Sequence, residues 1–329
     1  MPVPVDASMP FTLLTRLRLR WLPLLCMAAL LVGLPVSCGA LKYKERELLF
    51  RIEPGTAGWY RGLPQDVQEF DIKPASFKAG QNLHAWWWPA ARRDAPAILY
   101  LHGVRWNLTG QAFRIEQLRA MGYSVLAIDY RGFGQSHGEL PSEASVYEDA
   151  RAAWERFTAM QPDPGKRLIY GHSLGGAVAI DLAADLAAQA KKQHVAVPVH
   201  GLVIESTFTS LGDAVAEVAD TNLPVNGLPV RWLLSQKFDS IDKIVNIDMP
   251  LLVVHGLADP FMPSRFSQQL FNAAHPPKRL LLIPGGTHNN SMSLGGSQYR
   301  QALDGLMRAG PAASVALSTT QAATAPPRR

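Results

Sequence analysis

The chain has 329 residues, 47% of them hydrophobic and 18% charged, with a formal net charge of +5 at neutral pH. This length is enough to bury a sizeable core, either as one α/β domain with additions or as two domains. No basic stripe with interleaved aromatic residues is present, so nucleic-acid binding is not expected. Both cysteines, Cys26 and Cys38, lie in or beside an apolar N-terminal segment, which leaves the rest of the chain without a disulfide framework or a cysteine nucleophile.

The N-terminal segment has the order of an export signal. Three arginines, at positions 16, 18 and 20, precede an apolar run over residues 21–41, which at about 21 residues is long enough to cross a bilayer. We expect residues 1–45 to be a retained signal anchor, with a cleaved signal peptide as the alternative. This order favours a globular part outside the bacterial cytoplasm, at the inner membrane or in the periplasm, although the basic residues on the two sides of the run nearly balance.

A second form of membrane attachment is suggested by the residues before Cys38. The stretch Leu34-Pro35-Val36-Ser37-Cys38 is similar to a bacterial lipobox, with Pro35 where leucine is usual. Lipidation of Cys38 is therefore an alternative to the signal anchor.

Residues 46–309 are expected to form one α/β domain. Residues 67–72 and 83–88 are predicted to form an antiparallel strand pair. From residue 97 onward strands alternate with helices, which predicts a mostly parallel, doubly wound sheet. The later strands are predicted at 97–101, 123–128, 168–170, 202–205, 251–255 and 279–283, and the helices at 110–121, 142–160, 174–190, 263–273 and 298–308.

The alternation stops between Glu205 and Pro250. Two short helices are predicted there, over residues 211–220 and 230–237. An insertion at about 206–249 would form a small helical cap over the carboxyl ends of the strands. Residues 310–329 are rich in Ala, Ser, Thr and Pro without apolar periodicity and are predicted to be disordered.

A strand-turn-helix segment carries a candidate nucleophile. Residues 171–175 match G-x-S-x-G, in which glycines on both sides allow a tight turn that exposes Ser173 at the start of a helix. The alternative is a glycine-rich turn with a solvated serine. A serine hydroxyl needs a base, and the base needs an orienting acid.

The acid and the base are predicted on loops after later strands. Asp259 follows the strand at 251–255, and His288 follows the strand at 279–283, which is the order Ser, acid, His. The alternatives are a helix cap for Asp259 and a loop histidine for His288. For the oxyanion hole, the backbone N–H groups of Leu174 and Val104 are the candidates. No cofactor and no metal site is predicted.

These motifs resemble the α/β-hydrolase superfamily and, more narrowly, its membrane-anchored BEM46-like and ABHD13/ABHD17-like serine hydrolases. The motifs are LHG at 101–103, DYRGFGQSHG at 129–138, GHSLGG at 171–176, ESTFTS at 205–210 and MPLLVVHGLADPFMP at 249–263. The resemblance covers roughly residues 60–309 and implies the same five roles for the site residues. Two departures are Val104-Arg105-Trp106, where small residues and Asn are usual, and Asn289-Asn290, where an acid often follows the histidine.

The predicted function is that of a cofactor-independent serine hydrolase that cleaves an ester, thioester or amide acyl bond through an acyl-enzyme. The apolar cap and the membrane segment favour a lipid-like or acylated substrate. A serine aminopeptidase or prolyl-oligopeptidase-like peptidase is the alternative; it would need an acidic subsite, for which the candidates are Glu205, Asp213, Glu217 and Asp220. A catalytically silent, membrane-tethered binding module is the alternative of another class.

Overall fold

The computed structural model describes residues 39–222 and 234–309 of the chain. Most of the apolar run at 21–41, the segment 223–233 of the predicted cap and the tail at 310–329 lie outside these residues. Among the described helices, none combines the length and the apolar character needed to cross a bilayer. The chain divides into two compact units, Met1–Glu45 and Arg46–Arg329. The description below concerns the second unit.

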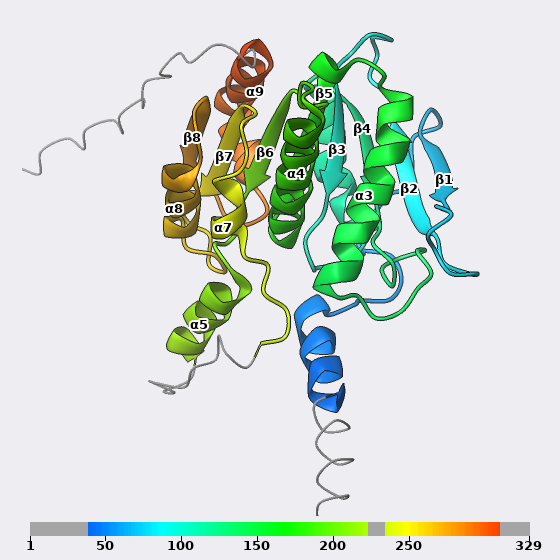
Figure 1. The fold of residues 1–329 in the computed structure, drawn as a ribbon, viewed down its shortest axis with the longest axis vertical. Coiled ribbons are helices and arrows are strands. Elements are labelled where there is room, and N and C mark those ends of the chain that lie inside the picture. Colours follow the sequence, from blue (N-terminus) through cyan, green and yellow to red (C-terminus); the bar gives the residue numbers. More distant parts are fainter. Residues whose placement is uncertain (1–38, 223–233, 310–329) are drawn as a thin grey trace, which may run out of the picture. The chain divides into compact units, whose positions relative to one another are not determined.

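An eight-stranded, mostly parallel sheet forms the centre of this unit (Figure 1). Its strands are β1 (Gln68–Ile72), β2 (Leu83–Trp88), β3 (Ala97–Leu101), β4 (Ser124–Ile128), β5 (Arg167–His172), β6 (Gly201–Glu205), β7 (Leu251–Gly256) and β8 (Lys278–Ile283). They lie in the order β1-β2-β4-β3-β5-β6-β7-β8. Strand β2 is antiparallel to both of its neighbours, and the other pairs are parallel. The predicted sheet with an antiparallel N-terminal pair is confirmed.

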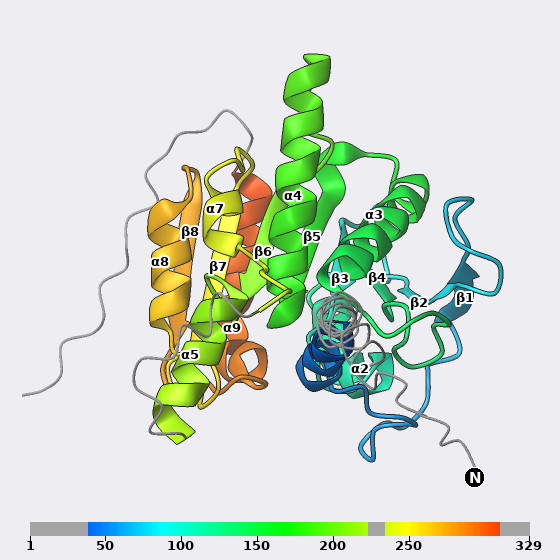
Figure 2. The same ribbon diagram turned by 60° about the horizontal axis from the view of Figure 1, so that its bottom comes forward.

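Helices cover both faces of the sheet (Figures 1 and 2). The helices of this unit are α2 (Leu108–Ala120), α3 (Glu143–Met160), α4 (Leu174–Gln193), α5 (Leu211–Asn222), α7 (Ser240–Ile244), α8 (Arg265–Ala273) and α9 (Ser291–Arg308), with a short 3₁₀ helix, η1 (Pro164–Lys166). Helix α5 lies beyond the ends of the strands in Figure 1. Helices α2 and α9 contribute to one hydrophobic core, and α3, α4, α7 and α8 contribute to the other. The alternation read from the sequence therefore corresponds to a three-layer arrangement.

Strands β3 to β7 are buried along their whole length, and most of their side chains are apolar because both faces of the sheet are covered. In β3, Ile98 and Tyr100 belong to the core beside α2 and α9, whereas Leu99 and Leu101 belong to the opposite core. In β2, Trp86 and Trp88 are buried in the α2 side of the molecule and serve as core residues. The sheet is thus held between two apolar layers.

One predicted helix is wrong in its described part. Residues 234–237, within the helix predicted at 230–237, are not helical, and the short helix α7 follows them instead. The carboxylate of Glu143 on α3 accepts hydrogen bonds from the N–H groups of Lys237 (2.6 Å) and Phe238 (2.9 Å). Phe238 also has a φ of 47°, which a right-handed helix does not allow. A tertiary contact therefore replaces the local helical hydrogen bonds.

The last helix begins earlier than predicted. Helix α9 starts at Ser291 rather than at residue 298, and it contains a kink at Gly296, where φ is 43°. Two adjacent glycines, at 295 and 296, made a helix over this stretch unfavourable by propensity. Burial of Met292 and Gly295 against the sheet offsets that preference.

Candidate active site

Ser173 lies at the sharp turn between β5 and α4. Its backbone has φ 56° and ψ −124°, a conformation that is rare and strained for a residue other than glycine. Gly175 lies against β3: a Cβ atom there would be 2.0 Å from the carbonyl oxygen of Leu101. A Cβ on Gly171 would be 2.1 Å from the carbonyl oxygen of Gly175. The two glycines thus permit the close approach that creates the turn, as the G-x-S-x-G pattern predicts.

The backbone of Ser173 is well bonded, whereas its hydroxyl is not. Its N–H donates to the carbonyl of Glu205 on β6 (2.9 Å), and its carbonyl accepts from the N–H of Gly176 (2.9 Å). The half-buried side-chain hydroxyl has no hydrogen-bond partner among the described residues. Ser173 therefore presents an uncommitted hydroxyl at the N-terminus of α4, where the helix dipole favours negative charge.

Asp259 and His288 are brought together by the loops after β7 and β8. Asp259 Oδ2 accepts a hydrogen bond from His288 Nδ1 at 2.7 Å. The other carboxylate oxygen accepts from the N–H groups of Phe261 (2.9 Å) and Met262 (3.0 Å). Both carboxylate oxygens are thus occupied, and Oδ2 fixes the tautomer of His288 that leaves Nε2 unprotonated.

The electrostatic surroundings keep Asp259 ionised. Burial of its carboxylate raises the pKa, but the hydrogen bond and charge of His288 and the two backbone N–H groups outweigh burial, so the pKa lies below its ordinary value. His255 at the end of β7 holds the same loop: Nε2 donates to the carbonyl of Met262 (2.8 Å), and Nδ1 lies 2.7 Å from the hydroxyl of Ser267. His255 therefore shapes the turn that carries Asp259.

The His288 loop, which we define as residues 284–290 between β8 and α9, packs against the serine turn. The rings of His172 and His288 are 4.9 Å apart between centroids, and His172 Nε2 donates to the carbonyl of His288 (2.8 Å). No hydrogen bond joins Ser173 and His288 within the described residues. Catalytic hydrogen bonds are often long without substrate and tighten in the Michaelis complex. The three predicted residues thus come from three neighbouring loops at one edge of the sheet.

The loop after β3 supplies the second predicted oxyanion donor. A Cβ on Gly103 would lie 2.9 Å from the Cβ of Ser173, so the backbone of this loop passes directly beside the serine. The N–H of Val104 donates to no acceptor among the described residues. Leu174 is the first residue of α4, and N–H groups in a first turn have no partner within the helix. The chain segments that carry both predicted donors therefore lie beside Ser173, and neither N–H group has an assigned acceptor among the described residues.

A buried ion pair behind the site was not predicted. Arg114 on α2 and Glu205 at the end of β6 are both completely buried, and Arg114 Nη1 lies 2.9 Å from Glu205 Oε2. The two residues are 91 positions apart, and no local pattern connects them. Glu205 had been a candidate for an acidic subsite; because it is buried and paired, it does not bind a substrate amine. Asp213 and Glu217 contact Thr209 and Arg265, and the side chain of Asp220 lies outside the described residues.

The burial of His172 predicts a pH effect on stability. Burial, assisted by the positive charge of Arg114, places the pKa of His172 well below its ordinary value. Because the unfolded chain then binds the proton more readily, the unfolding free energy falls as pH drops below about 6.5, by at most about 1.4 kcal/mol per pH unit for this residue.

Urea unfolding between about pH 7.5 and 5 measures this effect, since its linear extrapolation gives the unfolding free energy. His172→Gln should weaken the acid dependence, whereas His275→Gln, at an exposed position, should leave it unchanged. Part of the slope remains in the variant because burial also lowers the pKa of His255. Equal slopes in the wild type and in His172→Gln would contradict the prediction.

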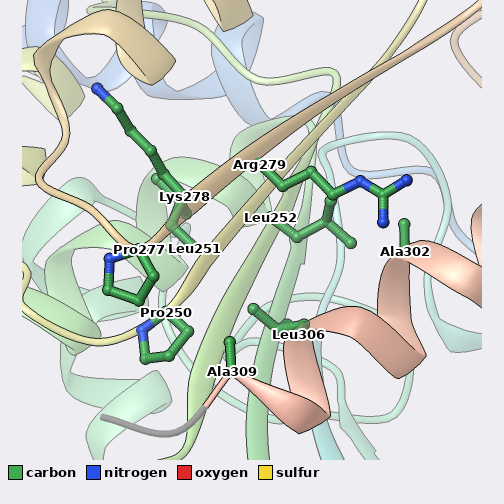
Figure 3. Close-up of a pocket in the computed structure, with 9 residues that line it drawn as sticks. All are labelled: Pro250, Leu251, Leu252, Pro277, Lys278, Arg279, Ala302, Leu306 and Ala309. Atoms are coloured by element: carbon green, nitrogen blue, oxygen red, sulfur yellow. The ribbon is translucent and has the colours of Figure 1, made fainter. Parts of the chain in front are cut away.

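Neither a metal site nor the depression shown in Figure 3 is part of this arrangement. In the described part of the chain, no three His, Cys, Asp or Glu side chains form a group that could hold a metal ion. The depression in Figure 3 lies between the first residues of β7 and β8 and the end of α9. Strands β5 to β8 are parallel, and Ser173 follows the carboxyl end of β5. The depression lies at the amino ends of β7 and β8, so it is at the opposite end of the strands from Ser173.

Comparison with known proteins places this fold in a family. The family model described as serine aminopeptidase, S33, matches residues 93–242. An uncharacterized protein of Mycobacterium tuberculosis is 36% identical over 231 residues, which cover 70% of this chain and 75% of that protein. The uncharacterized protein YfhR of Escherichia coli K12 is 29% identical over 231 residues, which cover 68% and 75%. Lysophosphatidylserine lipase ABHD12 of Xenopus tropicalis is 31% identical over 213 residues, covering 61% of this chain and 52% of the lipase.

Solved structures agree on the fold. The Pyrococcus furiosus esterase PF2001 superposes with a TM-score of 0.60 at 17% identity, covering 79% of this chain and 98% of that esterase. An α/β hydrolase from Vibrio vulnificus gives a TM-score of 0.56 at 22% identity, covering 73% and 81%. The identities are low, so these likenesses concern the fold alone. Sheet order, serine turn and sequence relatives together lead to one conclusion: the chain belongs to the α/β-hydrolase superfamily.

Proposed function

We propose that the protein is a serine hydrolase that cleaves acyl bonds, with Ser173 as nucleophile, His288 as base and Asp259 as the orienting acid. The observation that carries this proposal is the 2.7 Å hydrogen bond between Asp259 and His288 beside a strained serine with an uncommitted hydroxyl. Serine, acid and histidine follow β5, β7 and β8 in the chain order of this superfamily.

In the proposed reaction, Ser173 Oγ attacks the acyl carbonyl carbon and its proton passes to His288 Nε2. The oxyanion accepts hydrogen bonds from the N–H groups of Val104 and Leu174. The intermediate then collapses, and the leaving group takes the proton from His288. Water, deprotonated by His288, attacks the acyl-enzyme, and the acid product departs from a regenerated Ser173.

We further propose an apolar acyl group in the substrate. Leu257 and Phe261, on either side of Asp259, are 49% and 48% exposed, and the ring of Phe261 lies 5.6 Å from that of His288. Trp106, in the loop after β3 that carries Val104, packs against Trp59, with 5.3 Å between their ring centroids. The ring of Trp59 is half-exposed. The relative named a lysophosphatidylserine lipase supports the same substrate class. Attachment to a membrane through the N-terminal apolar run would bring such a substrate to the site.

A hydrolase of apolar acyl substrates is favoured over an aminopeptidase. The match to the serine aminopeptidase model supports the shared nucleophile, but binding of a free amine needs an accessible acid. Glu205, one of the acids predicted for such a subsite, is completely buried beside Arg114. We therefore propose an ester or thioester bond as the preferred target.

A fluorophosphonate probe tests the proposal. The Ser173 oxygen should displace fluoride from phosphorus, and mass spectrometry should place the adduct on Ser173. Ser173→Ala should lose labelling, whereas Ser76→Ala, at an exposed serine, should label like the wild type. Absence of labelling in folded wild-type protein would overturn the mechanism.

Substrate class is tested with p-nitrophenyl esters of increasing chain length alongside amino-acid p-nitroanilides. We expect turnover of esters, with an optimum at a medium or long acyl chain, and little turnover of the anilides. A preference for the anilides would support the peptidase instead.

A further inference from the structure

The buried ion pair between Arg114 and Glu205 is the centre of a polar cluster behind the proposed active site. Glu205 Oε2 accepts hydrogen bonds from Arg114 (2.9 Å), from Tyr299 (3.0 Å) and from Tyr170. Arg114 and Glu205 come from α2 and β6, and the two tyrosines come from β5 and α9. One carboxylate oxygen thus joins four elements that surround the serine turn and the His288 loop.

Stability alone does not explain this cluster. Removing two charges from water costs several kcal/mol per ion, and a buried pair often stabilises a fold no more than apolar residues of the same volume. Glu205 Oε1 and Arg114 Nε have no hydrogen-bond partner among the described residues, so the pair is not fully compensated. The contacts that the pair makes with backbone atoms point to another role.

One set of contacts leads to Ser173. The carbonyl of Glu205 accepts the N–H of Ser173 (2.9 Å), and the side chain of Glu205 holds Tyr170, which lies on β5 three residues before the serine. The residue that carries the buried carboxylate is therefore bonded to the backbone of the strained turn.

A second set leads to the His288 loop. His172 Nε2 donates to the carbonyl of His288 (2.8 Å), and Arg114 Nη2 donates to the carbonyl of the next residue, Asn289 (3.4 Å). A carbonyl can only accept, so Nε2 of His172 must carry the proton. Burial and the charge of Arg114 keep His172 neutral, so this tautomer is maintained. Two buried donors thus hold two consecutive carbonyls.

We propose that Arg114 and His172 are positioning residues that clamp the backbone of the His288 loop beside Ser173. The inference rests on the proposed function. Asp259 fixes the imidazole ring through Nδ1, and the clamp fixes the backbone that carries the ring. Together they define the place of Nε2, the atom that has to take the proton of Ser173. Catalysis is sensitive to such placement, since a displacement of about 1 Å costs about 10²-fold in rate.

Lysine replacement separates positioning from charge. Arg114→Lys keeps a cation beside Glu205 but lacks the planar fork that reaches both Glu205 and the Asn289 carbonyl. We expect kcat for a p-nitrophenyl ester to fall about 10- to 100-fold, with KM within about twofold of wild type. The matched control is Arg167→Lys: Arg167 is also buried and also donates to backbone carbonyls, but it begins β5 at the opposite end of that strand. Its kcat should stay within about twofold of wild type.

His172 provides a rescue test. His172→Gln retains an N–H donor near the position of Nε2 and should keep most of the wild-type kcat. His172→Leu removes the donor and should lower kcat to the level of Arg114→Lys. Melting temperatures and the fraction of sites that react with the fluorophosphonate correct every rate for folded protein.

The outcomes are distinct. An unchanged kcat in Arg114→Lys, an equal loss in Arg167→Lys, or a loss explained by unfolded protein would overturn the clamp. So would equal kcat values for His172→Gln and His172→Leu. Wild-type turnover that survives Ser173→Ala would instead overturn the proposed function itself, and the clamp with it.

Discussion

Replacement of Asp259 with asparagine is expected to lower kcat toward an acyl ester by about 10⁴-fold, with little change in KM. The asparagine carbonyl can keep the hydrogen bonds from the N–H groups of Phe261 and Met262, so the loop retains its shape. Its amide group then faces His288 Nδ1, where the carboxylate Oδ2 of the wild type accepts a hydrogen bond at 2.7 Å. An N–H donor at that point favours the tautomer protonated on Nε2, which cannot accept the proton of Ser173.

The same variant has an independent readout in stability. The folded chain holds the pKa of Asp259 below its ordinary value, so the carboxylate contributes stability above about pH 4 that is lost as pH falls through the folded pKa. Asp259→Asn should therefore show a flatter fall in unfolding free energy on acidification than the wild type.

Asp94 serves as the control for both measurements. Its side chain is 74% exposed and precedes β3 at the amino-terminal edge of the sheet, so Asp94→Asn should keep wild-type kcat and acid dependence. An Asp259→Asn enzyme that retains kcat within about tenfold would exclude Asp259 as the orienting acid.

Replacement of Gly175 with alanine is expected to lower the unfolding free energy by about 3 kcal/mol or more and to abolish labelling by the fluorophosphonate. The added methyl group would lie 2.0 Å from the carbonyl oxygen of Leu101 and 2.6 Å from that of His102. Both contacts are with backbone of β3 and its following loop, which cannot move aside as a flexible side chain does. Relief of the clash requires α4 to move away from β3, which also displaces Ser173.

Urea unfolding of Gly175→Ala beside Gly58→Ala measures this effect. At Gly58 an added Cβ meets nothing within 4 Å, so alanine there should be neutral or slightly stabilising through the unfolded state. If Gly175→Ala were as stable as Gly58→Ala, the close packing of α4 on β3 would be wrong.

The local elements followed from the sequence wherever burial imposed one pattern. Strands β2 and β3 begin and end at the predicted residues, where nearly all of their side chains are buried. Prediction failed where a distant group satisfied the backbone. The carboxylate of Glu143 binds the backbone N–H of Lys237 where a helix was predicted, and burial of Met292 accompanies the start of α9 ahead of two glycines. Helix propensity in a single sequence contains neither contact.

The candidate triad could be predicted from the sequence for a different reason. Ser173, Asp259 and His288 each follow a strand, and the carboxyl ends of parallel strands meet at one edge, so chain order alone places them on neighbouring loops. The sequence by itself therefore determined the fold class and the three catalytic candidates. Only the tertiary structure decided that Glu205 is buried against Arg114, that Asp259 bonds His288, and that Arg114 and His172 hold the His288 loop. Those contacts join residues up to 175 positions apart, and their geometry depends on how helices pack across the sheet, which no local pattern of residues encodes.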